Sequence, residues 1–188
     1  MNINKLAENI AHIITENDSK IIAIDGRCAS GKTTLSDKLR KLIPCNVIHM
    51  DHFFLRPEQR TPERLNTAGE NVDHERFLQQ VLLPLEAATP FTYRPFDCAT
   101  MTLGAPLQIA PKAITLVEGS YSCHPKFWDH YHLHVFCDVD PEEQLRRIVK
   151  RNPLSAKMFQ TKWIPLEESY FSAFSVQQRC DFIIKGSV

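Results

Sequence analysis

Short apolar runs alternate along the chain with stretches in which apolar residues recur at helical spacing. The β-branched and apolar runs predict five strands, over residues 20–24, 46–49, 113–118, 132–138 and 181–184. Apolar residues three and four positions apart predict helices over residues 33–42, 73–87, 141–150 and 166–174. Strands that alternate with helices are typical of βαβ units. We therefore expect an α/β protein with a mainly parallel sheet.

Two further elements are expected outside this alternation. Leu6, Ile10 and Ile14 fall on one helical face, which predicts an amphipathic helix near the N-terminus. Residues 91–96 and 101–109 are both rich in β-formers, and turn residues separate them. These two stretches predict a short antiparallel excursion from the main sheet.

Composition narrows the class of protein. The chain has 188 residues, which suits a single domain over residues 1–188, and it is 43% hydrophobic and 23% charged, as in ordinary globular proteins. Twenty-two basic residues balance 22 acidic ones, so charge gives no support for nucleic-acid binding.

No apolar run is long enough to span a bilayer, and charges interrupt the N-terminal apolar positions, so we expect neither a membrane span nor a signal peptide.

The cysteines bear on the cellular compartment. Six are present, and no two form a C-x-x-C pair. Without an export signal, we expect reduced thiols and a cytoplasmic location. The sequence gives no indication of the oligomeric state.

Residues 26–33 read GRCASGKT and match the pattern G-x-x-x-x-G-K-[ST] of a phosphate-binding P-loop. The predicted strand 20–24 precedes this loop and the predicted helix 33–42 follows it, which is the context that the motif requires. Glycines at 26 and 31 let the loop curl so that its N–H groups converge on phosphate oxygens, and the helix N-terminus adds a positive dipole end.

The P-loop also supplies candidate ATP-binding residues. They are Gly26, Arg27, Cys28, Ala29, Ser30, Gly31, Lys32, Thr33 and Thr34. We expect Lys32 to reach the β- and γ-phosphates and the Thr33 hydroxyl to bind Mg²⁺.

Two acidic residues follow predicted strands whose C-terminal ends should lie beside the P-loop. Asp51 comes directly after the second strand, where a carboxylate suits a general base that takes a proton from an attacking hydroxyl, or a partner of Mg²⁺. Glu118 ends the run ITLVE, as in a Walker B segment whose acid reaches Mg²⁺ or its water shell. Which of the two is the base stays open.

Several longer segments appear in the order found in one family. They are IDGRCASGKTT at 24–34, MDHFF at 50–54, NVDHERF at 71–77, LVEGSY at 116–121 and VFCDVD at 135–140. With these segments the chain resembles the uridine kinase-like branch of P-loop small-molecule kinases, from about residue 21 to residue 184. The resemblance implies a three-layer P-loop NTPase fold with helices on both faces of the sheet. It also implies a lid over roughly residues 141–162 and transfer of phosphate from ATP to a hydroxyl of a small metabolite.

The resemblance further implies roles for individual residues. Asp51 matches the family's catalytic aspartate, and Asp73 matches an aspartate that grips acceptor hydroxyls. Tyr93 matches an aromatic residue of the acceptor pocket. Arg147 and Arg151 match lid arginines that would close on the triphosphate, neutralise developing charge and exclude water.

The acceptor pocket departs from the uridine kinase pattern. Phe54 and Tyr121 are expected to contact the acceptor, but Arg94 stands where the family has an acid, and Cys98 stands near the place of a histidine. Either Arg94 recognises an anionic group of the acceptor, or it is an ordinary arginine on a strand surface. Asp97 is an internal anion that would satisfy it. The first alternative predicts that uridine and cytidine are poor substrates.

Other P-loop functions remain as alternatives. A GTPase would need an N-K-x-D motif, and the nearest string, residues 152–155, reads NPLS. A regulatory domain that binds nucleotide, or an ATP hydrolase without a small-molecule acceptor, is the second possibility. Retention of Lys32, Thr33, Asp51 and Glu118 favours the phosphotransferase.

Overall fold

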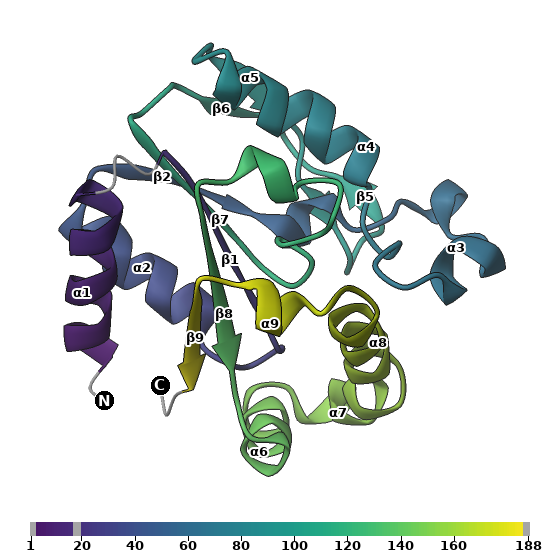
Figure 1. Ribbon diagram of the computed structural model, residues 1–188. Helices are drawn as coiled ribbons and strands as arrows, with labels where there is room; N and C mark the ends of the chain where they lie inside the picture. The colour runs from purple at the N-terminus through teal and green to yellow at the C-terminus, as the bar shows by residue number, and fades with distance from the viewer. Residues whose placement is uncertain (1–2, 17–19, 186–188) are drawn as a thin grey trace.

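The computed structural model describes residues 3–16 and 20–185. Its centre is a five-stranded sheet in the order β2-β7-β1-β8-β9, with all adjacent strands parallel (Figure 1). The strands are β1 (Ile21–Gly26), β2 (Cys45–His49), β7 (Ile114–Glu118), β8 (Leu133–Asp138) and β9 (Phe182–Lys185). All five predicted strands are therefore confirmed. They were recognisable because parallel strands covered on both faces consist of nearly uninterrupted apolar residues.

Alternate side chains of the central strands enter two separate cores. Ile22 and Ile24 face the first core, against α1 (Ile3–Glu16) and α2 (Lys32–Leu42). Ala23 and its neighbours in the other strands face the second core, which is rich in aromatic side chains. Figure 1 shows α1 and α2 on one side of the sheet and α4, α5 and α8 on the other. The expected three-layer α/β architecture is confirmed.

The predicted helix over residues 73–87 forms in three parts. They are α4 (His74–Phe77), a π-helical segment η3 (Leu78–Leu82) and α5 (Leu83–Glu86). Pro84 is the second residue of α5. A proline has no N–H to donate, and its ring clashes with the carbonyl four residues earlier in an α-helix. The wider π-turns directly before Pro84 let the helix continue past it.

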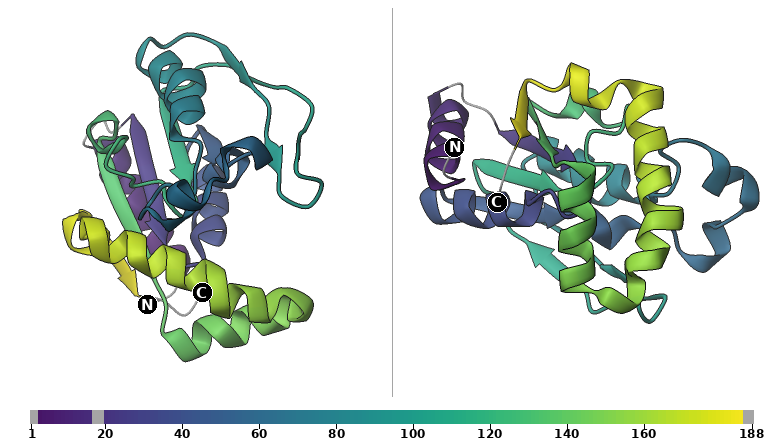
Figure 2. Two further views of the ribbon diagram at one scale, coloured as in Figure 1. Left: turned by 90° about the vertical axis from the view of Figure 1, so that its right-hand side faces the viewer. Right: turned by 90° about the horizontal axis from the view of Figure 1, so that it is seen from below.

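A helical hairpin, named the lid segment, spans residues 141–174 and contains residues 141–162, for which the sequence resemblance implies a lid. It consists of α6 (Pro141–Arg151), η5 (Pro153–Ser155), α7 (Ala156–Met158), a second π-helical segment η6 (Phe159–Trp163) and α8 (Ile164–Phe174). α6 and the run from α7 to α8 lie side by side in both views of Figure 2. The hairpin begins at Pro141 and continues past residue 162 to Phe174, and its closure over a ligand stays a prediction. Pro165 is the second residue of α8 and directly follows the π-turns of η6, just as Pro84 follows the π-turns of η3.

The antiparallel excursion is confirmed as two short ladders. β3 (Phe91–Tyr93) pairs with β6 (Leu107–Ile109), and β4 (Phe96–Asp97) pairs with β5 (Thr102–Leu103). The remaining elements are short: η1 (Met50–Phe53), η2 (Pro57–Gln59), α3 (Pro62–Asn66), η4 (Trp128–His130) and α9 (Val176–Arg179). No helix among residues 3–16 and 20–185 is long and apolar enough to cross a membrane.

Because β1, β2, β7 and β8 are parallel, the segments that follow them lie along one edge of the sheet. The P-loop follows β1, and the segment that begins at Met50 follows β2. Gly119 and Ser120 follow β7. At the end of β1, the backbone of Gly26 packs directly against the backbone of Cys137. A Cβ atom on Gly26 would lie only 2.0 Å from the carbonyl oxygen of Cys137. Gly26 also has a φ of +132°, which side chains other than glycine rarely tolerate.

These contacts predict that Gly26→Ala destabilises the protein by at least ~3 kcal/mol, from backbone strain and overpacking together. Urea unfolding measures the change. Gly104→Ala is the matched control, because a Cβ there would have no neighbour closer than 3.4 Å, and we expect it within ~0.5 kcal/mol of wild type. Equal stabilities for the two variants would contradict the described geometry of the loop.

Candidate active site

A cavity of about 520 Å³ opens at the edge of the sheet where the parallel strands end. Its walls come from the P-loop, the segments after β2 and β7, the lid, and the loops around residues 60, 71 and 98. The lining residues are Cys28, Ala29, Gly31, Lys32, Thr33, Thr34, Asp51, Phe54, Arg60, Asn71, Cys98, Glu118, Gly119, Ser120, Tyr121, Arg147, Arg151, Phe159, Trp163 and Glu167. The volume is typical of small-molecule sites.

The P-loop presents backbone donors to this cavity. Gly31 adopts a left-handed conformation with a φ of 101° and precedes α2 without a side-chain cap. The N–H groups of Ala29, Gly31 and residues 32–34 donate to no protein acceptor within the described part of the chain. All these residues line the cavity. Uncapped amides at a helix N-terminus form an anion site, which suits the phosphates of a nucleotide.

Lys32 adds a positive charge to the same wall. Its Nζ donates to the carbonyl oxygens of Gly26 at 2.6 Å and Arg27 at 2.9 Å. The side chain is buried, yet no carboxylate in residues 3–16 or 20–185 forms an ion pair with it. The direct partners of this ammonium group are therefore neutral oxygens, and an anion bound at the loop would add a direct ionic contact that offsets the cost of its burial.

Thr33 and Glu118 lie together as a Mg²⁺ site requires. The Thr33 hydroxyl is 3.4 Å from both carboxylate oxygens of Glu118. Mg²⁺ typically takes one or two carboxylates together with waters and substrate phosphates, so this pair beside a phosphate loop fits the ion. His49 Nδ1 lies 2.5 Å from Glu118 Oε1, and this hydrogen bond raises the pKa of His49.

Asp51 lines the same cavity as the P-loop, and part of the residue is open to it. Its pKa is raised, chiefly because surrounding protein removes much of its hydration. The charge of Lys32 opposes the shift, and the charges of Glu118 and Glu167 add to it. A carboxylate with a raised pKa is a better proton acceptor while it remains ionised near neutral pH.

Asp25 is a buried carboxylate that sequence reasoning missed. It accepts hydrogen bonds from the N–H groups of Gly26 at 2.6 Å, Tyr121 at 3.2 Å and Cys123 at 2.8 Å, and from the Tyr170 hydroxyl at 2.9 Å. Complete burial raises its pKa to about 6 despite these donors. An acid at the end of an apolar strand and directly before the loop glycine was the signal for such a group.

The first part of the P-loop is held by the lid segment and by the end of β8. Arg27 forms ion pairs with Asp138 and with Glu168, the latter at 2.6 Å from Nε. Gln144 donates to the carbonyl oxygen of Cys28 at 3.1 Å, and Arg147 donates to that of Ala29 at 3.1 Å. Arg27 therefore anchors the loop and does not line the cavity.

Glu167 is a second residue that sequence reasoning missed. Its carboxylate accepts from the Ser120 hydroxyl at 2.6 Å and from the N–H of Cys28 at 3.0 Å. Burial and the charge of Glu167 raise the pKa of the Cys28 thiol to about 12, so this thiol is not activated by the helix N-terminus. In the sequence, the pair Glu167–Glu168 has the appearance of a solvated helical surface and gives no signal of this role.

Two residues that were expected to contact the acceptor line the cavity. They are Phe54 and Tyr121, whose ring centroids lie 6.3 Å apart in an edge-to-face arrangement. Arg147 and Arg151 of α6 also line it, and their role as lid arginines stays a prediction. Tyr121 has a φ of 74°, a strained conformation for a residue with a side chain, and such strain is often found at functional sites.

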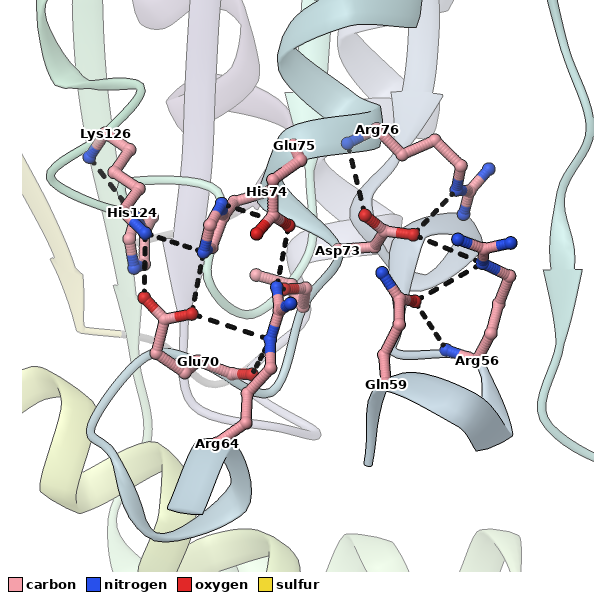
Figure 3. A network of polar contacts seen from close by, with 11 residues as sticks. Arg56, Gln59, Arg64, Glu70, Asp73, His74, Glu75, Arg76, His124 and Lys126 are labelled. Carbon is pink, nitrogen blue, oxygen red and sulfur yellow. Dashed lines mark hydrogen bonds and ion pairs between the residues drawn. The ribbon is translucent and has the colours of Figure 1, made fainter. Parts of the chain in front are cut away.

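Asp73 and Tyr93 lie elsewhere. Asp73 caps α4 by accepting from the N–H of Arg76 at 3.1 Å, and its other oxygen receives Arg56 and Arg76 side chains at 3.4 and 3.3 Å (Figure 3). Tyr93 is buried with its hydroxyl 3.1 Å from His52 Nδ1. Neither lines the cavity. Their contacts explain the described fold, and a contact with the acceptor stays a prediction.

Arg94 is an exposed arginine between β3 and β4, which is close to the second of the two alternatives, an ordinary surface arginine. Its guanidinium donates to the carbonyl oxygens of Gly104 at 2.7 Å and Leu103 at 3.0 Å, and it does not line the cavity. The expectation that Arg94 reads an anion in the acceptor pocket is therefore corrected. The β excursion exposes its backbone carbonyls next to Arg94, and these satisfy the guanidinium.

Comparison with known proteins identifies the fold. No model of a known protein family matches the sequence, and no curated protein matches it significantly. Among solved structures, a possible uridine kinase from Bacillus stearothermophilus aligns with a TM-score of 0.73 at 20% identity, over 98% of this chain and 100% of that one. YFH7 from Saccharomyces cerevisiae, described as a candidate P-loop-containing kinase with a circular permutation, aligns with a TM-score of 0.70 at 12% identity, over the whole of both chains.

These likenesses show that the chain has a P-loop kinase fold. The fold is that of the uridine kinase-like kinases, as the sequence resemblance implied. At identities of 20% and 12%, the likeness concerns the fold alone, and reaction and acceptor have to be inferred from the chemistry of the site.

The phosphate loop yields a paired prediction. Lys32→Ala should weaken binding of a non-hydrolysable ATP analogue roughly ten- to hundredfold, because it removes a charged donor. Thr33→Ala should weaken binding through Mg²⁺, so raising Mg²⁺ should restore part of its affinity and none of that of Lys32→Ala. Calorimetric titration at several Mg²⁺ concentrations measures both. Lys41→Ala, on an exposed position of α2, is the control. Unchanged affinity in Lys32→Ala would refute the phosphate site.

Proposed function

We propose that this protein is an ATP-dependent phosphotransferase that moves the γ-phosphate of ATP to a hydroxyl group of a small metabolite. The observation that carries the proposal is the common cavity of the P-loop and Asp51. A phosphate cradle alone suits any nucleotide-binding protein. A carboxylate of raised pKa on the wall of the same cavity is what an attacking hydroxyl needs.

In the proposed reaction, the acceptor oxygen forms a bond to the γ-phosphorus while the bond from that phosphorus to the β-phosphate oxygen breaks. The hydroxyl proton passes to the Asp51 carboxylate, and ADP is the leaving group. Lys32 and the amides of the P-loop hold the β- and γ-phosphates and stabilise the charge that develops on their oxygens. Asp51 then releases its proton to solvent after the product leaves.

Thr33 and Glu118 would hold a magnesium ion beside the phosphates. When bound, the ion neutralises phosphate charge and orients the triphosphate. Arg147 and Arg151 reach the same cavity from the lid. Their positive charges favour the transferring phosphoryl group, and the lid side chains Phe159 and Trp163 would exclude water from it.

The alternative is a nucleotide-binding regulator or an ATP hydrolase without a small-molecule acceptor. Turnover separates these functions. A kinase consumes ATP only when its acceptor is present, a hydrolase consumes it alone, and a regulator binds it without turnover.

We also propose a cytoplasmic location, to which six free cysteines are suited.

The experiment that tests the proposal is a coupled assay of ADP release over a panel of hydroxyl-bearing metabolites. The panel contains nucleosides, sugars, sugar phosphates and hydroxy acids. Acceptor-dependent ADP release, with the phosphorylated acceptor identified by mass spectrometry, would support the proposal. Release of ADP at the same rate without any acceptor would instead support the hydrolase.

Asp51→Asn tests the proton acceptor. We expect affinity for the ATP analogue to persist while kcat falls by ~10²–10⁴-fold, because the amide cannot take the hydroxyl proton. Steady-state kinetics and calorimetry measure the two quantities. Asp37→Asn, on the exposed face of α2, is the control and should retain wild-type turnover. A kcat within a few-fold of wild type in Asp51→Asn would make Glu118 the preferred base.

The pH dependence of kcat/KM gives a further prediction. Asp51 must be ionised to accept a proton, so activity should be lost as pH falls through its pKa, which lies above the ordinary value of 3.8. Glu167→Gln removes one negative charge that raises this pKa, and it should move the acidic limb of the profile to lower pH. A limb that stays in place, or moves upward, would show that another group titrates.

A further inference from the structure

Five arginines lie between residues 56 and 94, and three of them are neutralised within the protein. Arg56 and Arg76 pair with Asp73, and Arg64 pairs with Glu70 and Glu75 (Figure 3). The guanidinium groups of these three arginines therefore have carboxylate partners, and none of the three lines the cavity.

Arg60 differs from the other four. It is the arginine of this segment that lines the cavity, and no carboxylate of the described residues forms an ion pair with it. Its Nε donates to the carbonyl oxygen of Leu55 at 2.8 Å, and its guanidinium lies 5.8 Å from the Phe96 ring centroid. The hydrogen bond to the Leu55 carbonyl holds the Nε end of the guanidinium in place. Cys98 is its further neighbour, and a thiol is only a weak hydrogen-bond acceptor.

The cations of the cavity divide between two walls. Lys32 contacts the carbonyls of the P-loop, and Arg147 donates to Ala29 of the same loop. These two charges belong with the nucleotide. Arg151, from the same helix as Arg147, also lines the cavity and is assigned to the nucleotide with them, whereas Arg60 comes from the loop between η2 and α3. Its guanidinium lies beside the Phe96 ring of the β excursion, so Arg60 lines the cavity from a wall other than the P-loop, and Asp51 lines the same cavity.

We propose that Arg60 binds an anionic group of the acceptor, so that the substrate is a small hydroxyl compound that also carries a carboxylate or a phosphate. This inference rests on the proposed phosphotransferase function. A guanidinium presents two parallel N–H donors that match a carboxylate or a phosphate oxygen pair. With Nε bound to Leu55, the terminal nitrogens of Arg60 are the donors that such a group would use.

The test compares matched acceptors that differ only in charge. Glycerol, glycerate and glycerol 3-phosphate form one set, and ribose, ribonate and ribose 5-phosphate form another. In each set we measure kcat/KM by ADP release and, separately, binding to protein saturated with a non-hydrolysable ATP analogue and Mg²⁺. We expect an anionic member to exceed its neutral counterpart by about ten- to a hundredfold. Which anionic member does so distinguishes carboxylate from phosphate.

Three variants assign this preference to Arg60. Arg60→Gln should remove the advantage of the anion, and Arg60→Lys should retain part of it because the charge persists without the planar fork. Arg94→Gln is the control, since that arginine lies outside the cavity, and it should behave as wild type. Thermal unfolding checks that each variant folds.

Two results would overturn the inference. Neutral acceptors that equal the anionic ones in both kcat/KM and binding would do so, and so would an anion preference that survives in Arg60→Gln. The binding measurement separates this failure from failure of the proposed function. Anionic probes that bind through Arg60 without ADP release would support the anion site, and the wider metabolite panel would then decide on the phosphotransferase.

Discussion

The buried carboxylate of Asp25 is the constraint on which the arrangement of the site depends. A carboxylate without access to water must receive hydrogen bonds, and four donors from three separate parts of the chain supply them. The donors belong to the start of the P-loop, the segment after β7 and helix α8 of the lid. Packing of apolar side chains alone would leave these three parts free to shift by small amounts. The shared carboxylate fixes them to one point, and the cavity between them acquires a defined shape.

The lid and the P-loop consequently act as one assembly. Arg27 and Cys28 are held by Glu168 and Glu167 of α8, whereas the amides of residues 31–34 have no protein acceptor in the described chain. At the start of the loop, the Arg27 guanidinium and the Cys28 N–H thus already donate to protein carboxylates. The later N–H groups remain available to donate to phosphate oxygens. A nucleotide that binds these later N–H groups meets a loop whose beginning is already ordered, which lowers the entropic cost of binding.

The sequence predicted the parts of this structure that follow from local patterns. The five parallel strands and the P-loop were readable because apolar runs and glycine spacing specify them directly, and Asp51 and Glu118 followed because they end strands. The partners of individual charges were not readable. Arg60 and Arg94 are both arginines in polar stretches, and only the path of the β excursion decides which one finds backbone carbonyls and which one lines the cavity. Glu167 was hidden for the same reason, since its partners lie far away in sequence.

The π-turns before Pro165 have a consequence for the rotational phase of the lid helix. Phe159, Trp163 and Glu167 are spaced four residues apart and all line the cavity. In a continuous α-helix, each step of four residues advances about 40° beyond a full turn, so the outer two would diverge by about 80°. The wider π-turns from Phe159 to Trp163 rotate the chain by less per residue and offset the advance of the α-helical step that follows. The proline thus keeps three side chains in phase over two turns of the lid, and a single-residue deletion within residues 159–163 would rotate Phe159 away from the cavity while leaving the helix itself intact.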